Sequence, residues 1–420
     1  MLGRRGDVSR VHPMRSVMSS HRTGLSVLFL LQGIAMAMWF VPLSPVLEAH
    51  GLGALRPYAF ATSSVAGLVT PLIFGAFADR HASPVAVLRW VSAATAVMLA
   101  LTNLAIERHA PPMVVLFLIQ LQSLLSTPTW SLLTAAGLAG LKDAKREFGP
   151  IRAFGTFGWM AGCVLVSALG ADASTRAGFS ACAFWIAVAV VAAFVPSTPL
   201  PRAEGSASAR ERLGLDALRL LRIPDHRVVF LTAALVTIPL AAFYPFAPSH
   251  LRDLGFSHTS AWMALAQVTE VIAMFGLGTM LANIRLKWVL ATGLGFAVLR
   301  FVLLASGTKA AVLVGVSLHG FAFTLFFVAV PIYLNEHIEA GWRTRAQALL
   351  SLMTQGIGGL TGYLGSGLWL EVCQRQDGSG TTSWPLFWGG LATIVAAVYG
   401  YFLIAYHERP SGAPAISGRW

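Results

Sequence analysis

The chain has 420 residues, of which 56% are hydrophobic and 11% are charged, and its mean hydropathy is +0.68. A soluble domain carries about 25% charged residues, so this composition excludes a water-soluble globular protein. The formal net charge of +12 would suit a nucleic-acid partner. The basic residues, however, lie in short loops between apolar runs, so we interpret the charge as membrane topology and expect no nucleic-acid binding.

The apolar runs are about 20 residues long, which is the length of a transmembrane helix rather than of a barrel strand. We therefore predict an all-α integral membrane protein with twelve spans. In chain order the predicted spans are 24–46, 57–77, 86–106, 112–138, 151–171, 177–195, 228–248, 260–282, 287–306, 310–333, 345–370 and 384–406.

The longest polar connection separates these spans into two groups of six. It predicts an N-terminal tail 1–23, a first half 24–195, a central loop 196–227, a second half 228–406 and a C-terminal tail 407–420. The central loop begins with Pro196, Pro199 and Pro201, and we expect a short amphipathic helix from Leu213 to Leu221.

The loops alternate in basic character along the chain. With both termini on one side, twenty Lys and Arg residues lie in the loops and tails of that side, against six on the other. Basic loops stay in the cytoplasm. We therefore expect a multi-pass protein of the cell inner (cytoplasmic) membrane with both termini, and hence the central loop, in the cytoplasm.

Two six-helix halves are typical of transporters that bind a solute near the midplane and expose it alternately to each side. No phosphate-binding GxxxxGK[ST] motif occurs, which argues against pumping driven by ATP. The cysteines Cys163, Cys182 and Cys373 lack CxxC spacing, and no His-Glu metal motif occurs. We expect no cofactor, no metal and no enzymatic activity.

Few ionisable residues lie within the spans, and such residues usually face a cavity and serve a function. Glu270 and Gln267 lie three residues apart on one helical face, where a carboxylate could bind a solute or carry a proton; the alternative is a structural hydrogen bond between helices. Arg152 and Thr156 likewise share a face, although Arg152 could instead reach the headgroups. For Arg300 we favour a structural role.

The segment after the second span predicts gating and packing rather than substrate chemistry. Small residues allow two helices to approach closely, and the charged pair that follows can bond across a helix end. The residues assigned to this role are Gly75, Asp79 and Arg80.

The Gly75–Arg80 segment resembles the signature that follows the second helix of the major facilitator superfamily. Further stretches resemble one branch of it, the nucleoside:proton symporters, in order over nearly the whole chain. They are Pro150-Ile151-Arg152 with Gly155-Thr156-Phe157-Gly158-Trp159, Leu213-Gly214-Leu215-Asp216-Ala217, Gln267-Val268-Thr269-Glu270, Leu299-Arg300-Phe301, Arg345-Ala346-Gln347 and Met353-Thr354-Gln355-Gly356-Ile357-Gly358.

This resemblance implies a major-facilitator fold and a nucleoside site formed by Arg152, Thr156, Gln267 and Glu270. Where the family has a glutamine and an asparagine in the seventh span, this chain has Ala241 and Tyr244.

In the tenth span, where the family has an aromatic residue and a proton-coupling aspartate, this chain has Phe323 and Thr324. We include Tyr244, Phe323 and Thr324 in the predicted cavity. Glu270 remains as the acidic residue in the middle of a span, so we assign proton coupling to it.

The predicted protein is a monomer in lipid that transports nucleosides, or similar small polar ring compounds, with protons. At Tyr244 and Thr324 the chain differs from the family pattern. The transported solute could therefore instead be a sugar or a drug-like compound, and the direction of transport could be efflux. A sensor that binds solute without transporting it is a second alternative. A membrane enzyme would need a catalytic constellation that the sequence does not contain.

Overall fold

A computed structural model describes residues 12–78, 83–141, 144–196, 208–377 and 381–408, and this part of the chain is helical without a strand. The predicted all-α class is confirmed. Within these ranges ten helices are long and apolar enough to cross a membrane. The predicted spans 57–77 and 345–370, which are not among these ten, are also helical and complete the twelve.

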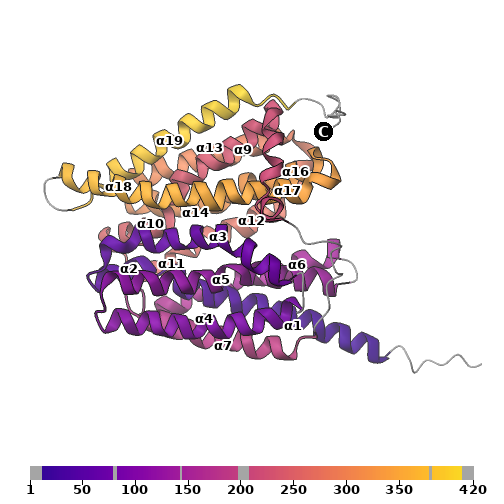
Figure 1. Cartoon of the computed structure of the whole chain (residues 1–420). Helices are drawn as coiled ribbons and strands as arrows, with labels where there is room; N and C mark the ends of the chain where they lie inside the picture. The colour runs from indigo at the N-terminus through magenta and orange to yellow at the C-terminus, as the bar shows by residue number, and fades with distance from the viewer. Residues whose placement is uncertain (1–11, 79–82, 142–143, 197–207, 378–380, 409–420) are drawn as a thin grey trace, which may run out of the picture.

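The first half packs as one bundle, drawn in indigo to magenta in the lower layer of Figure 1. Its helices are α1 (His12–Phe40), α2 (Leu43–Ala49), the 3₁₀ turn η2 (Gly53–Leu55), α3 (Arg56–Ala78), α4 (Pro84–Glu107), α5 (Pro112–Gly140), α6 (Ala144–Ala168) and α7 (Arg176–Phe194). The fifth span was predicted to begin at residue 151, but α6 begins at Ala144. An apolar window detects only the part of a helix suited to lipid, whereas the hydrogen-bonded backbone continues into the polar flank.

The second half forms the upper layer of Figure 1, and several of its predicted spans are broken into shorter helices. They are α9 (Pro224–Leu240), α10 (Phe243–Asp253), α11 (Thr259–Met263), α12 (Leu265–Asn283), α13 (Leu286–Ala305), α14 (Lys309–Ser317), α15 (His319–Ala322), η4 (Phe323–Val328), α16 (Ala329–His337), α17 (Ala340–Ser351), η5 (Leu352–Gly358), α18 (Gly359–Asp377) and α19 (Trp384–Ala405). The elements η4 and η5 are π-helical. One such break separates α9 from α10 and is flanked by Pro239 and Pro245, which supply no backbone N–H to a helix.

The central connection contains two short helices, α8 (Ala209–Arg212) and the 3₁₀ helix η3 (Leu215–Arg222). The predicted short amphipathic helix corresponds to η3, although the predicted segment, Leu213 to Leu221, begins two residues before it. Gly214 interrupts the segment with φ = +68°, a conformation that favours glycine, and a Cβ there would lie 2.4 Å from the backbone nitrogen of Leu349. At the start of α8 the backbone N–H of Ser208 donates to Glu211, which lowers the pKa of that carboxyl.

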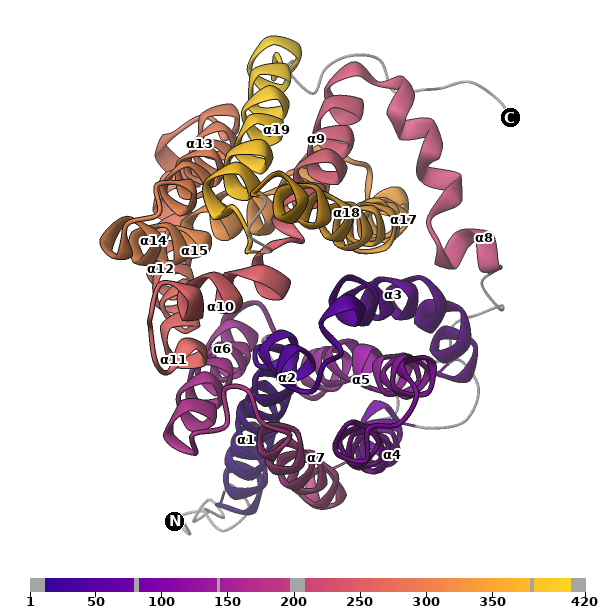
Figure 2. The ribbon, with the colours of Figure 1, turned by 90° about the vertical axis from the view of Figure 1, so that its left-hand side faces the viewer.

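Polar contacts join the two halves at the end of the molecule opposite this connection. Ser44 of α2 donates to the carbonyl of Pro245 over 2.5 Å, and Glu48 forms ion pairs with Arg56 and Arg252. Ser249 of α10 also donates to Glu48, over 3.1 Å. We call Ser44, Glu48, Arg56, Ser249 and Arg252 the latch. Figure 2 looks onto this end, where α2 and α10 lie side by side between the bundles.

A second set of contacts closes the same end beside the latch. The carboxylate of Asp172, after α6, accepts from the backbone N–H of Ser260 over 2.7 Å, and the hydroxyl of Ser167 accepts from the N–H of Ala261 over 3.0 Å. Both sets join the halves at one end, so this end of the interface is closed.

We predict that Glu48→Gln loosens the latch. Replacing the carboxylate removes two ion pairs and leaves the nearly buried Arg56 without its countercharge, and a hydrogen bond to a charged group contributes about 1.5–3 kcal/mol. A cysteine placed at buried Ser44 should therefore react about tenfold faster with a maleimide in the purified protein. Glu107→Gln is the control, because the Glu107 carboxylate accepts a hydrogen bond from Thr175 of the same half. Equal labelling rates in both variants would show that Glu48 does not hold this end closed.

Candidate functional site

The residues predicted to bind substrate come from both halves. Arg152 and Thr156 lie on α6 of the first half, and Tyr244 on α10 of the second. The remaining predicted residues are Gln267 and Glu270 on α12, and Phe323 and Thr324 on η4. The sequence pairs on α6 and α12 are therefore on helices of opposite halves, as an interface site requires.

Tyr244 and Gln267 are joined directly. The side-chain amide of Gln267 donates to the Tyr244 hydroxyl over 3.1 Å, and Gln267 is buried. The Tyr244 ring also packs edge-on against two aromatic rings of the first half, Phe40 at 5.3 Å and Trp159 at 5.9 Å. Tyr244 thus reaches across the interface, which a helix-face argument about its own half could not predict.

Arg152 and Glu270 lie on opposite halves, close enough for their charges to interact. Their opposite charges interact electrostatically, although these two described residues do not form a direct ion pair. The Arg152 guanidinium lies over the ring of Trp130, 4.7 Å from its centre, which holds the cation within the first half. Both side chains are half-buried, as is Thr156. The arrangement brings a cation of the first half and a carboxylate of the second half to the same interface.

Thr324 is fully buried and turns toward the backbone of α12. Its hydroxyl donates to the carbonyl oxygen of Glu270 over 3.4 Å. Its neighbour Phe323 is half-buried and stacks with His319 and Phe327, at 6.0 and 5.7 Å between ring centres. The hydroxyl at position 324 therefore ties η4 to α12, and it supplies no titratable group.

The predicted gating residues are only partly described. Gly75 lies in α3, whereas Asp79 and Arg80 lie outside the described residues.

Two features of the site were not predicted from the sequence. The first is the π-helical geometry of η4 and η5, a form that often occurs at functional sites. The second is His319, which lies on α15 one turn before Phe323 and packs against Tyr244. A histidine within an apolar span is itself a signal that could have identified it.

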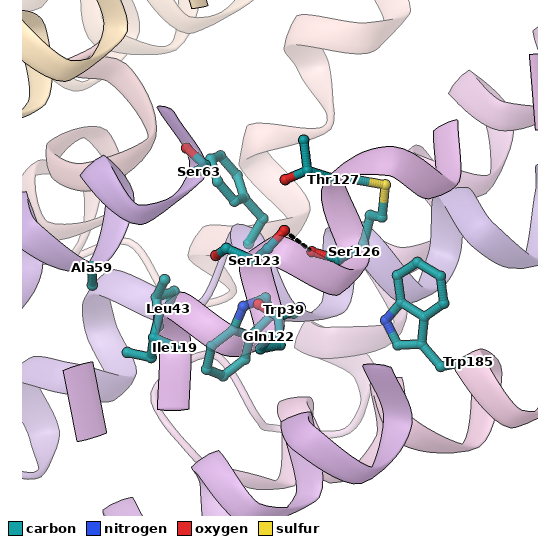
Figure 3. Close-up of a pocket in the computed structure, with 12 residues that line it drawn as sticks. Trp39, Leu43, Ala59, Ser63, Ile119, Gln122, Ser123, Ser126, Thr127 and Trp185 are labelled. Atoms are coloured by element: carbon teal, nitrogen blue, oxygen red, sulfur yellow. Dashed lines mark hydrogen bonds between the residues drawn. The ribbon is translucent and has the colours of Figure 1, made fainter. Parts of the chain in front are cut away.

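A separate pocket lies inside the first half, as Figure 3 shows. Serines 63, 123 and 126, Thr127 and Gln122 line it together with Trp39, Phe40 and Trp185, among others. Its volume is about 80 Å³. None of the residues predicted to bind substrate lines it, so this pocket is separate from the candidate site at the interface.

The profile of the family described as nucleoside H⁺ symporter matches residues 19–410. The chain belongs to the nucleoside H⁺ symporter family. It is 30% identical to the putative nucleoside transporter YegT of Escherichia coli (strain K12), over 93% of this chain and 95% of that one. It is 23% identical to the nucleoside permease NupG and 24% identical to the xanthosine permease of the same strain. These alignments cover 94% and 92% of this chain, and 98% and 96% of the relatives.

Solved structures agree on the fold of this nucleoside H⁺ symporter family member. The crystal structure of nucleoside transporter NupG superposes with a TM-score of 0.79 at 22% identity, covering 92% of this chain and 99% of that one. A structure of a NupG mutant gives 0.82, covering 92% and 100%. The chain is thus a multi-pass membrane protein of the major-facilitator type, in a family of transporters.

We predict that Gly320→Ala destabilises the wall of this site. A Cβ at Gly320 would lie 2.1 Å from the backbone nitrogen of Glu270, so α12 and α15 would have to separate. Overpacking of this kind costs about 1–3 kcal/mol, and the melting temperature of the detergent-purified protein should fall. Gly276→Ala on α12 is the matched control, because its Cβ would meet no atom within 4 Å. Equal melting temperatures for the two variants would contradict the close approach.

Proposed function

We propose that this protein is a secondary active transporter that carries nucleosides together with protons by alternating access. The observation that carries the proposal is the opposition of Arg152 on one half and Glu270 on the other, at an interface that must open and close. The family supports nucleosides as cargo and protons as the coupling ion. A transported solute needs no catalytic group, and we propose no enzymatic activity.

We propose that the protein lies in the inner membrane as a monomer, with both termini in the cytoplasm. Support for this orientation comes from the excess of basic residues in the loops on that side. The latch then faces the outside, and the structure corresponds to a state closed to the outside. A solute would be released to the cytoplasm from this state.

The proposed proton step follows from the charges at the interface. An ionised Glu270 attracts Arg152 across the halves, whereas a protonated Glu270 does not. Protonation of Glu270 and binding of substrate therefore change the free energy of bringing the two halves together around Arg152 and Glu270. Because Thr324 cannot ionise, Glu270 is the group to which we assign the transported proton.

Vesicles containing the purified protein should take up labelled uridine or adenosine when an inward pH gradient is imposed. The expected result is accumulation above protein-free vesicles, because each proton moving down its gradient drives a nucleoside inward. No uptake above the control would reject nucleosides as cargo, and uptake unaffected by a protonophore would reject only the coupling to protons.

Glu270→Gln should abolish gradient-driven accumulation while leaving downhill equilibration of nucleoside, because the amide keeps the hydrogen-bonding shape but cannot exchange a proton. The internal-to-external ratio should fall to about one, the value for uncoupled transport. Glu336→Gln, at the exposed end of α16, is the control and should accumulate normally. Accumulation retained by the Glu270 variant would remove this residue from the coupling step.

A second candidate keeps the fold and changes the cargo to a sugar or a drug-like compound, moved in either direction. Two positions of the predicted cavity favour it. Tyr244 and Thr324 occupy positions where the nucleoside:proton symporters have an amide and an acidic side chain. Thermal-shift binding across nucleosides and sugars distinguishes the two candidates. Specific binding without any flux would instead indicate a sensor.

A further inference from the structure

Arg300 is a fully buried cation whose polar contact is a histidine. Its Nη1 lies 2.5 Å from Nδ1 of His319, and its guanidinium lies over the ring of Phe243, 4.3 Å from the centre. No Asp or Glu of the described residues forms an ion pair with it. Arg300 therefore directs its N–H groups at an aromatic ring nitrogen rather than at a carboxylate.

This contact determines which nitrogen of His319 carries the proton. A guanidinium can only donate hydrogen bonds, so Nδ1 must present a lone pair to accept one. An imidazole whose Nδ1 accepts is neutral and bears its hydrogen on Nε2. While the contact holds, His319 is a neutral ring with an N–H donor at Nε2.

The environment of the ring places that donor at the candidate site. His319 stacks on Phe243 at 4.5 Å and on Phe323 at 6.0 Å, and the Tyr244 ring meets it edge-on at 6.1 Å. The exposed fraction of His319 is 8%, and within the described part of the chain no residue hydrogen-bonds to Nε2. The N–H of Nε2 is thus an unused donor among aromatic rings, beside two residues assigned to the cavity.

We propose that His319 determines specificity by donating its Nε2 hydrogen to an acceptor atom of a flat nucleobase, and that Arg300 is the positioning residue that fixes this tautomer. This inference rests on the proposed nucleoside transport. The half-buried rings of Tyr244 and Phe323 suit a planar base, because aromatic faces and edges pack against flat rings. The base acceptor gains a directional partner in surroundings that supply few others.

The alternative role for a histidine here is to carry the proton. Taking up a proton at Nδ1 would break the Arg300 contact and place two cations side by side in a buried position. The charged and titratable groups around the ring are Arg300 on α13, Tyr244 on α10 and Glu270 on α12, whose backbone nitrogen lies against Gly320. Glu270 is the better proton acceptor of the set, because a carboxylate becomes neutral on taking up a proton and adds no second cation beside Arg300.

The tautomer is tested first, and this test does not depend on transport. The full-length protein is labelled with ¹⁵N-histidine, and the His319 signals are assigned by their loss in His319→Gln. We expect one neutral ring with its hydrogen on Nε2 between about pH 5 and pH 8, where a free histidine changes its charge. A hydrogen on Nδ1, or a doubly protonated ring in this range, would overturn the proposal.

The second test uses binding of adenosine and its 1-deaza, 3-deaza and 7-deaza analogues, each of which lacks one ring-nitrogen acceptor. In the unmodified protein one analogue should bind about 2- to 10-fold more weakly than adenosine, the range for a neutral hydrogen bond. In His319→Leu this difference should disappear. His319→Gln should restore it, because its amide nitrogen lies near the position of Nε2.

Identical adenosine-to-analogue ratios in the unmodified protein and in His319→Leu would overturn the assigned contact. Failure of the proposed function is distinguishable from this result, since a protein that does not recognise nucleosides binds neither adenosine nor its analogues and still reports the His319 tautomer.

Discussion

The interaction on which the arrangement of the site depends is the electrostatic attraction between Arg152 and Glu270, which lie on opposite halves. A charged side chain within a membrane is expensive unless it meets a partner or a water-filled cavity. The Arg152 guanidinium lies over the ring of Trp130, which belongs to the same half. The carboxylate that attracts Arg152, that of Glu270, belongs to the other half. Each half therefore carries one charge that is best satisfied by the presence of the other, which favours a polar site between them.

A second set of polar contacts, in which no carboxylate side chain takes part, accompanies this pair. Gln267 donates to Tyr244, Thr324 donates to the backbone of Glu270, and Arg300 donates to His319. All three bonds lie within the second half. They hold α10, α12, α13, α15 and η4 together around the carboxylate, so that the second half supplies a preformed wall and the first half supplies the opposing cation.

The sequence was sufficient to predict the spans, because hydropathy reports burial in lipid residue by residue. It also placed Gln267 and Glu270 on one helical face, because residues three positions apart in a helix share a face. It could not predict the contact of Tyr244 with Phe40 and Trp159, since that contact joins residues about two hundred and about eighty positions apart. The break at Gly214 was missed because amphipathic periodicity does not register one backbone dihedral. The π-helical turns leave no signature in hydropathy either.

The latch and the charged pair act at different depths on the same interface. Glu48 of the first half binds Arg252 of the second at one end, while Arg152 and Glu270 face each other deeper in the molecule. Opening the latch end exposes Glu48, Arg56 and Arg252 to water, where an ion pair contributes little. The charges at the latch can therefore separate at a modest cost, whereas separating Arg152 from Glu270 in the membrane interior requires something to replace the lost attraction. We propose that a proton on Glu270 or a polar solute between the two side chains provides that replacement, which would couple movement of the halves to both.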